Sequence, residues 1–85
     1  MPGDLTDRDR AILALEVSWP RHNGAKEEAI RTQLGMSPAR YYQLLWRLID
    51  TEQALEHDPL LVRRLRRIRD SRGVQRSVRM QGFVG

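Results

Sequence analysis

The chain lacks the residues that several classes of protein chemistry require. Its 85 residues include no cysteine and only two histidines, His22 and His57. The first absence excludes disulfides, thiolate zinc sites and cysteine nucleophiles, and two histidines are too few for most histidine-based metal sites. No apolar run approaches the ~18 residues of a membrane span, and no signal-peptide core is present near the N-terminus. We therefore expect a soluble, cytoplasmic protein that uses neither metal nor cofactor and does not bind membranes.

The sequence also lacks a recognisable catalytic arrangement. A chain of this length forms one domain that buries only about 60 % of its unfolded surface, so a large catalytic cleft would consume much of it. The four serines have no plausible His/Asp partners, and the adjacent Glu27 and Glu28 would project about 100° apart on a helix. The glycines form no phosphate-binding loop. The sequence therefore predicts a binding protein and not an enzyme.

Positive charge is concentrated at one end of the chain. The whole sequence has 15 Lys and Arg against 11 Asp and Glu, a net charge of +4. Residues 1–59 have a net charge of −3, whereas residues 60–85 contain eight arginines and one aspartate. Lys26 is the only lysine. Arginine suits phosphate groups and base edges, so this clustering predicts a polyanionic partner.

Two amphipathic helices are expected in the first half of the chain, after a lead-in over residues 1–5. Thr6 and Asp9 resemble a capping box, and apolar residues with helical spacing follow as far as Trp19. Leu13 and Val17 form a second apolar stripe on this helix, which we interpret as a contact with a second subunit. A second helix is expected over residues 25–34.

Residues 35–37 have the features of the turn in a helix-turn-helix motif. Gly35 occupies the position that favours a left-handed backbone, Ser37 is a strong N-cap, and Pro38 suits the first helical position. The helix that follows, over residues 38–50, is the expected recognition helix. Arg31 and Tyr41 depart from the usual pattern, because a small residue and Val or Ile are more common at these positions.

The side of the recognition helix that faces away from the apolar residues indicates which side chains would contact DNA. Arg40 and Gln43 face away from the apolar side and are the candidates for base edges, because Arg favours guanine and Gln favours adenine. Trp46 is expected to pack against the next helix or a second subunit. Residues 51–57 are expected to form a short helical turn, and a basic helix follows over residues 59–70. The candidates for contacts with the DNA backbone are Ser37, Tyr42, Arg47, Arg63, Arg64, Arg66, Arg67, Arg69, Arg72 and Arg76.

The expected fold is all-α, a small helix-turn-helix domain of three to four helices over residues 6–70. Residues 71–85 lack periodicity and are expected to form a flexible basic arm. Four segments resemble a family of short actinobacterial proteins classed as a domain of unknown function, over roughly residues 4–70. These segments are residues 5–8 (LTDR), 24–30 (GAKEEAI), 40–45 (RYYQLL) and 57–64 (HDPLLVRR). The core also resembles, distantly, the promoter-reading helix-turn-helix of sigma factors, which implies this fold and nucleic-acid binding.

The predicted function is double-stranded DNA binding in the nucleoid, by a transcription regulator or a nucleoid-associated protein. The alternative is an adaptor that contacts RNA polymerase or another regulator, with the second stripe of the first helix and Trp46 as its contact surface. RNA binding is less favoured, because the sequence lacks an aromatic platform for single strands. The residues leave open whether the protein is a homodimer, which DNA sequence it binds and whether it activates or represses.

Overall fold

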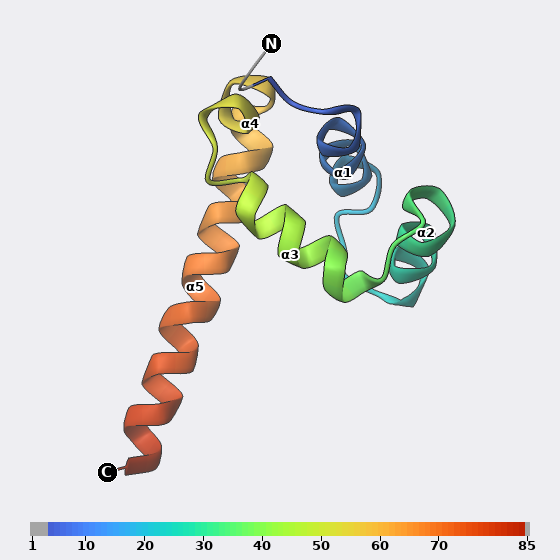
Figure 1. Ribbon diagram of the computed structural model, residues 1–85. Coiled ribbons are helices and arrows are strands. Elements are labelled where there is room, and N and C mark those ends of the chain that lie inside the picture. Colours follow the sequence, from blue (N-terminus) through green and yellow to red (C-terminus); the bar gives the residue numbers. More distant parts are fainter. Residues whose placement is uncertain (1–3, 85) are drawn as a thin grey trace.

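The computed structural model describes the backbone of residues 4–84 and the side chains of residues 4–71. Every regular element in this part of the chain is a helix, which confirms the all-α class (Figure 1). Five helices take the place of the expected three to four, because the short turn expected at residues 51–57 forms a helix of its own. Their bounds are α1 Asp7–Ser18, α2 Gly24–Leu34, α3 Pro38–Leu48, α4 Glu52–His57 and α5 Pro59–Val84.

The ends of the first helices follow from local side-chain hydrogen bonds. At the start of α1, the Thr6 hydroxyl accepts a hydrogen bond from the backbone N–H of Asp9, and the Asp9 carboxylate accepts one from the Thr6 N–H. This arrangement is the predicted capping box. Helix α2 begins at Gly24 and not at Ala25, because the Asn23 side chain caps it by accepting from the N–H of Lys26 at 2.9 Å.

Helices α1, α2 and α3 surround a core that the N-terminal part of α5 completes. The core consists of Ile12, Leu13, Leu15, Ala29, Ile30, Tyr41, Leu45, Leu48, Ile49, Ala54, Leu61, Val62 and Leu65. Leu13 is only 1 % exposed, whereas Val17 is 59 % exposed. The interpretation of Leu13 as part of an intersubunit stripe is therefore wrong: α1 is covered by its own chain at this position. Tyr41 packs in the core as expected.

Helix α5 is much longer than the sequence pattern predicted. We expected it to end near residue 70, but its backbone remains helical to Val84, so residues 71–84 form helix instead of an irregular arm. Residues 71–84 contain no proline and include several good helix formers, and the helical backbone continues through Gly73 and Gly82. In Figure 1 the C-terminal half of α5 extends beyond the other four helices. Among the described residues, no helix combines the length and apolar character that a bilayer crossing demands.

Candidate functional site

The turn between α2 and α3 fixes the direction in which α3 leaves the core. Gly35 has a φ of 64°, and its N–H donates to the carbonyl oxygen of Arg31 at 3.1 Å. A residue with a side chain would be strained in this left-handed conformation. Two residues later the Ser37 hydroxyl accepts from the N–H of Arg40 at 3.2 Å, and Pro38 begins the helix. Glycine, cap and proline therefore have the structural roles that the sequence predicted.

The outward side of α3 presents the predicted base-contacting residues to solvent. Arg40, Gln43 and Arg47 are all exposed, while Tyr41 and Leu45 on the opposite side are fully buried. Neither Arg40 nor Arg47 forms an ion pair within the described part of the chain. Two unpaired guanidinium groups and one amide therefore share an open helical surface. We call Arg40, Gln43 and Arg47 the α3 surface.

The aromatic residues of α3 lie on its flank, away from the α3 surface. The Tyr42 hydroxyl forms a hydrogen bond with Nδ1 of His22, and the ring stacks on Trp46 with a centroid separation of 6.0 Å. Trp46 is half-buried and lines a small cavity with Leu65 and Ile68 of α5. Trp46 therefore packs under the next helix, as expected. Tyr42 is already engaged inside the chain, which makes it a poor candidate for a phosphate contact.

A buried polar cluster supports α3 from below. The side chains of Glu16 on α1 and Lys26 on α2 form an ion pair while only 5 % and 4 % exposed, respectively. The Tyr41 hydroxyl donates to Oε2 of Glu16 at 2.7 Å. Burial, followed by the charge of Glu16 and this hydrogen bond, raises the pKa of Tyr41 far above its ordinary value. The cluster joins the three helices that carry the α3 surface.

Sequence reasoning missed this cluster, although the sequence contained two signals. Lys26 is the only lysine among 15 basic residues. Glu16 lies four residues after Ile12, and therefore on the same apolar stripe of its helix. Arg31, which departed from the expected pattern, causes no obstruction because it is exposed beside Glu28, at 3.7 Å.

Two of the arginines of α5 have structural partners. Arg66 donates from Nε to the carbonyl oxygen of Ile49, just beyond the end of α3, at 2.6 Å. Arg69 forms ion pairs with Asp50 at 2.7 Å and with Asp70 at 3.3 Å. These contacts attach α5 to the C-terminal end of α3. Both arginines were predicted to contact DNA, but the structure places them between the two helices.

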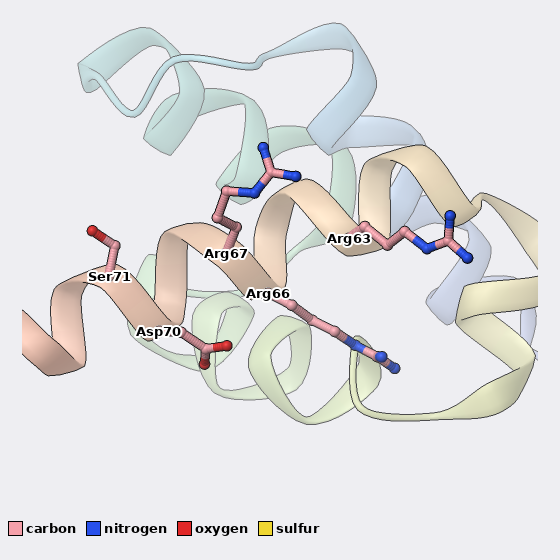
Figure 2. A pocket seen from close by; sticks show the side chains of 5 residues that line it. All are labelled: Arg63, Arg66, Arg67, Asp70 and Ser71. Carbon is pink, nitrogen blue, oxygen red and sulfur yellow. The ribbon is translucent and has the colours of Figure 1, made fainter.

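The remaining described arginines of α5 are free. Arg63, Arg64 and Arg67 are exposed and form no ion pair among the described residues. Figure 2 shows Arg66 and Arg67 leaving opposite sides of α5, with Arg66 directed toward the segment that joins α3 to α4. Arg63 and Arg67 line a shallow depression together with Arg66, Asp70 and Ser71. Arg72 and Arg76, the other predicted contacts, lie outside the residues whose side chains are described.

These features define a small all-helical protein with a solvent-exposed basic surface on α3 and a long arginine-rich final helix. Within the described residues, no group of three or more His, Asp or Glu side chains is placed to hold a metal ion. The chain belongs to the family described as "Protein of unknown function (DUF3263)", whose match covers residues 4–77. The predicted resemblance to a domain of unknown function is thereby confirmed. Neither the curated proteins nor the solved structures yield a significant match.

Proposed function

We propose that this protein binds double-stranded DNA through a helix-turn-helix formed by α2, residues 35–37 and α3. The observation that carries the proposal is the α3 surface, which presents Arg40 and Gln43 to solvent near the start of a helix that is anchored on its other side. The major groove admits one α-helix, and side chains near the N-terminus of a recognition helix reach the base edges. Arg40 and Gln43 are the base-contacting residues in this arrangement.

Phosphate contacts flank the recognition helix. Ser37 stands at the N-terminus of α3, where backbone N–H groups favour an anion. Arg47 lies about two turns after Arg40 on the same side of the helix. Arg63 and Arg67 of α5 would supply further phosphate contacts, since each is exposed and unpaired within the described chain. Such a protein acts in the nucleoid as a transcription regulator or a nucleoid-associated protein.

A binding titration with matched variants tests the proposal. We expect the wild-type protein to bind duplex DNA, and we expect Arg40→Ala and Gln43→Ala each to relax sequence preference by about 1–3 kcal/mol at one base pair. Arg8→Ala is the matched control, because Arg8 is exposed on α1, outside the proposed helix-turn-helix. Fluorescence anisotropy against a randomised duplex pool and a selected duplex measures both effects. The proposal fails if the α3 variants bind every sequence as the wild type does.

A further inference from the structure

The described chain leaves three large apolar side chains exposed: Leu60 and Ile68 lie on one side of α5, and Val17 of α1 lines the same groove as Leu60. Val17 is 59 % exposed, Leu60 80 % and Ile68 39 %. Leu60, Arg64 and Ile68 are spaced four residues apart, so they lie on one side of α5. They form a strip about 12 Å long at 1.5 Å per residue. We call Leu60, Arg64 and Ile68 the α5 strip.

A groove beside the strip joins α5 to the end of α1. It has a volume of about 410 Å³ and is lined by Val17, Pro20, Asp58, Leu60, Leu61 and Arg64. The Asp58 carboxylate is already engaged, because its Oδ1 accepts from the N–H of Leu61 at 3.2 Å as the cap of α5. Arg64 has no ion-pair partner within the described chain. The groove therefore has apolar walls and one arginine that forms no ion pair, beside a carboxylate that caps α5.

The positive charge near the strip is unfavourable for the isolated helix. Arg63 and Arg67 are four residues apart and Arg64 and Arg67 three apart, and like charges at these spacings repel each other. They also follow the N-terminal turn of α5, whose positive dipole end favours anions. No acidic side chain of the described chain pairs with any of the three. An acidic ligand would relieve this repulsion.

We propose that the groove and the α5 strip bind an acidic amphipathic helix of another protein. Two apolar side chains two helical turns apart would cover Leu60 and Ile68, with Val17 beside the first, while flanking Asp or Glu residues would pair with Arg64 and Arg67. Helix-in-groove recognition uses this combination of apolar anchors and complementary charge. Duplex DNA does not fit equally well, since phosphates gain nothing from the exposed leucine and valine.

A second copy of the chain is also a poorer occupant. Two strips that meet about a two-fold axis would bring Arg64 and Arg67 of one copy toward the same arginines of the other, because such an interface is self-complementary. The expected partner is therefore a different protein with an acidic helix. This surface is separate from the α3 surface, although Arg67 is also one of the proposed phosphate contacts.

A designed peptide tests the proposal with the intact protein. The probe is a labelled synthetic helix that has two leucines seven residues apart, which matches the length of the strip, and flanking glutamates. We expect the wild-type protein to bind it, and we expect binding to weaken at least tenfold for Leu60→Ser and for Arg64→Glu. Replacing each glutamate of the peptide by glutamine should weaken binding in the same way. Arg8→Glu is the matched control, because Arg8 is exposed and unpaired in the described chain at the far end of α1, and it should change affinity less than twofold.

Two further measurements separate the competing occupants. Amide chemical shifts should move at Val17, Leu60 and Ile68 when the peptide is added, and circular dichroism should show that each variant is folded. The proposal is overturned if the peptide does not bind at millimolar concentration, or if the shifts map to Arg40 and Gln43. It is also overturned if Leu60→Ser weakens DNA binding, or if it converts a self-associated wild type to monomer in sedimentation. Loss of DNA binding by α3 variants alone leaves the peptide result unaffected, so the two proposals can fail separately.

Discussion

At the scale of single residues, the buried ion pair between Glu16 and Lys26 is the feature with the largest desolvation cost. Removing two charges from water is costly, and the cost is offset only when each charge is paired and hydrogen-bonded. Here Lys26 also lies 5.4 Å from the centroid of the Tyr42 ring, and Glu16 accepts from Tyr41. No buried side-chain polar atom of the described chain is left without a partner. Every polar group of the cluster therefore has a partner, and replacing one member should destabilise the fold strongly.

We expect Lys26→Met to destabilise the fold by about 3–5 kcal/mol, because it leaves the Glu16 carboxylate buried without its counter-ion. Adding Glu16→Gln should recover a large part of this loss, since glutamine is uncharged and can still accept from Tyr41. Urea unfolding of the wild type, both single variants and the double variant measures the coupling. Arg31→Ala serves as a control and should cost less than about 1 kcal/mol, because its pair with Glu28 is on the surface. Equal stability of the single and double lysine variants would contradict this account.

Tyr41 should make the fold sensitive to alkaline pH. Its pKa in the folded protein is raised above the ordinary value of 10.0, chiefly by burial and then by the charge and hydrogen bond of Glu16. Below pH 10 the phenol is neutral in both states, so its contribution is fully present. Above pH 10 the unfolded state ionises first, and stability falls by up to about 1.4 kcal/mol per pH unit.

The Tyr41→Phe variant should lose this part of the alkaline slope, although its stability at pH 7 should also be lower because the bond to Glu16 is gone. Thermal unfolding between pH 8 and pH 11 measures the slope. Tyr42→Phe is the matched control, because Tyr42 is only half-buried. An unchanged slope in Tyr41→Phe would show that other groups control alkaline unfolding.

At the scale of helices, the sequence was most informative where a local rule determines the backbone. The capping box at Thr6, the glycine at position 35 and the Ser–Pro start of α3 were all predicted, because each depends on residues within a few positions. The contacts of Arg66 with Ile49 and of Arg69 with Asp50 could not be predicted, since these partners are 17 and 19 residues away in the sequence. The end of α5 was missed for another reason: a segment without proline can continue a helix even where it has no apolar periodicity.

The turn before α3 gives a direct test of a local rule. Gly35→Ala should destabilise the protein by about 1–2 kcal/mol, because its φ of 64° is unfavourable for a residue with a Cβ. No neighbouring atom lies within 4 Å of the added Cβ, so backbone strain is the only direct cost. Gly35→Asn should cost less, since asparagine tolerates this conformation.

Gly24→Ala is the matched control for this prediction. Its site is equally open and no left-handed φ is required there, so we expect it to be neutral or slightly stabilising. Denaturant midpoints measured in parallel distinguish the two glycines. Equal effects of the two alanine substitutions would show that the left-handed turn is not what positions α3.

Neighbouring arginines on α5 should behave differently. Arg66→Ala should cost about 1–2 kcal/mol of stability, because the Ile49 carbonyl oxygen loses a charged donor at 2.6 Å. Arg67→Ala should change stability by less than about 0.5 kcal/mol, since Arg67 is exposed and unpaired in the described chain. Thermal unfolding of both variants tests this. Similar losses of stability would contradict a structural role for Arg66 and its absence for Arg67.

At the scale of the whole molecule, the separation of negative and positive charge along the chain determines which surfaces would bind a polyanion. The first 59 residues have a net charge of −3, and the positive charge of the last 26 residues lies on the helix that extends from the domain. The acidic residues of the N-terminal part do not neutralise Arg40 or Arg47, which belong to the same part of the chain. The α3 surface and α5 therefore present positive charge from two elements that Arg66 and Arg69 hold together.

If both elements contact one duplex, its affinity should depend steeply on salt. About six phosphate contacts give a slope near −5 for log K against log salt, which means a loss of roughly 10³-fold between 50 and 200 mM. The double variant Arg63→Ala with Arg67→Ala should reduce the magnitude of this slope by about 2 on every sequence, because each lost contact releases about 0.9 counterion fewer. Arg40→Ala should instead change which sequence is preferred. Anisotropy titrations at four salt concentrations measure the slope. An unaltered slope in the double variant would show that α5 does not contact the duplex and that the α3 surface alone binds it.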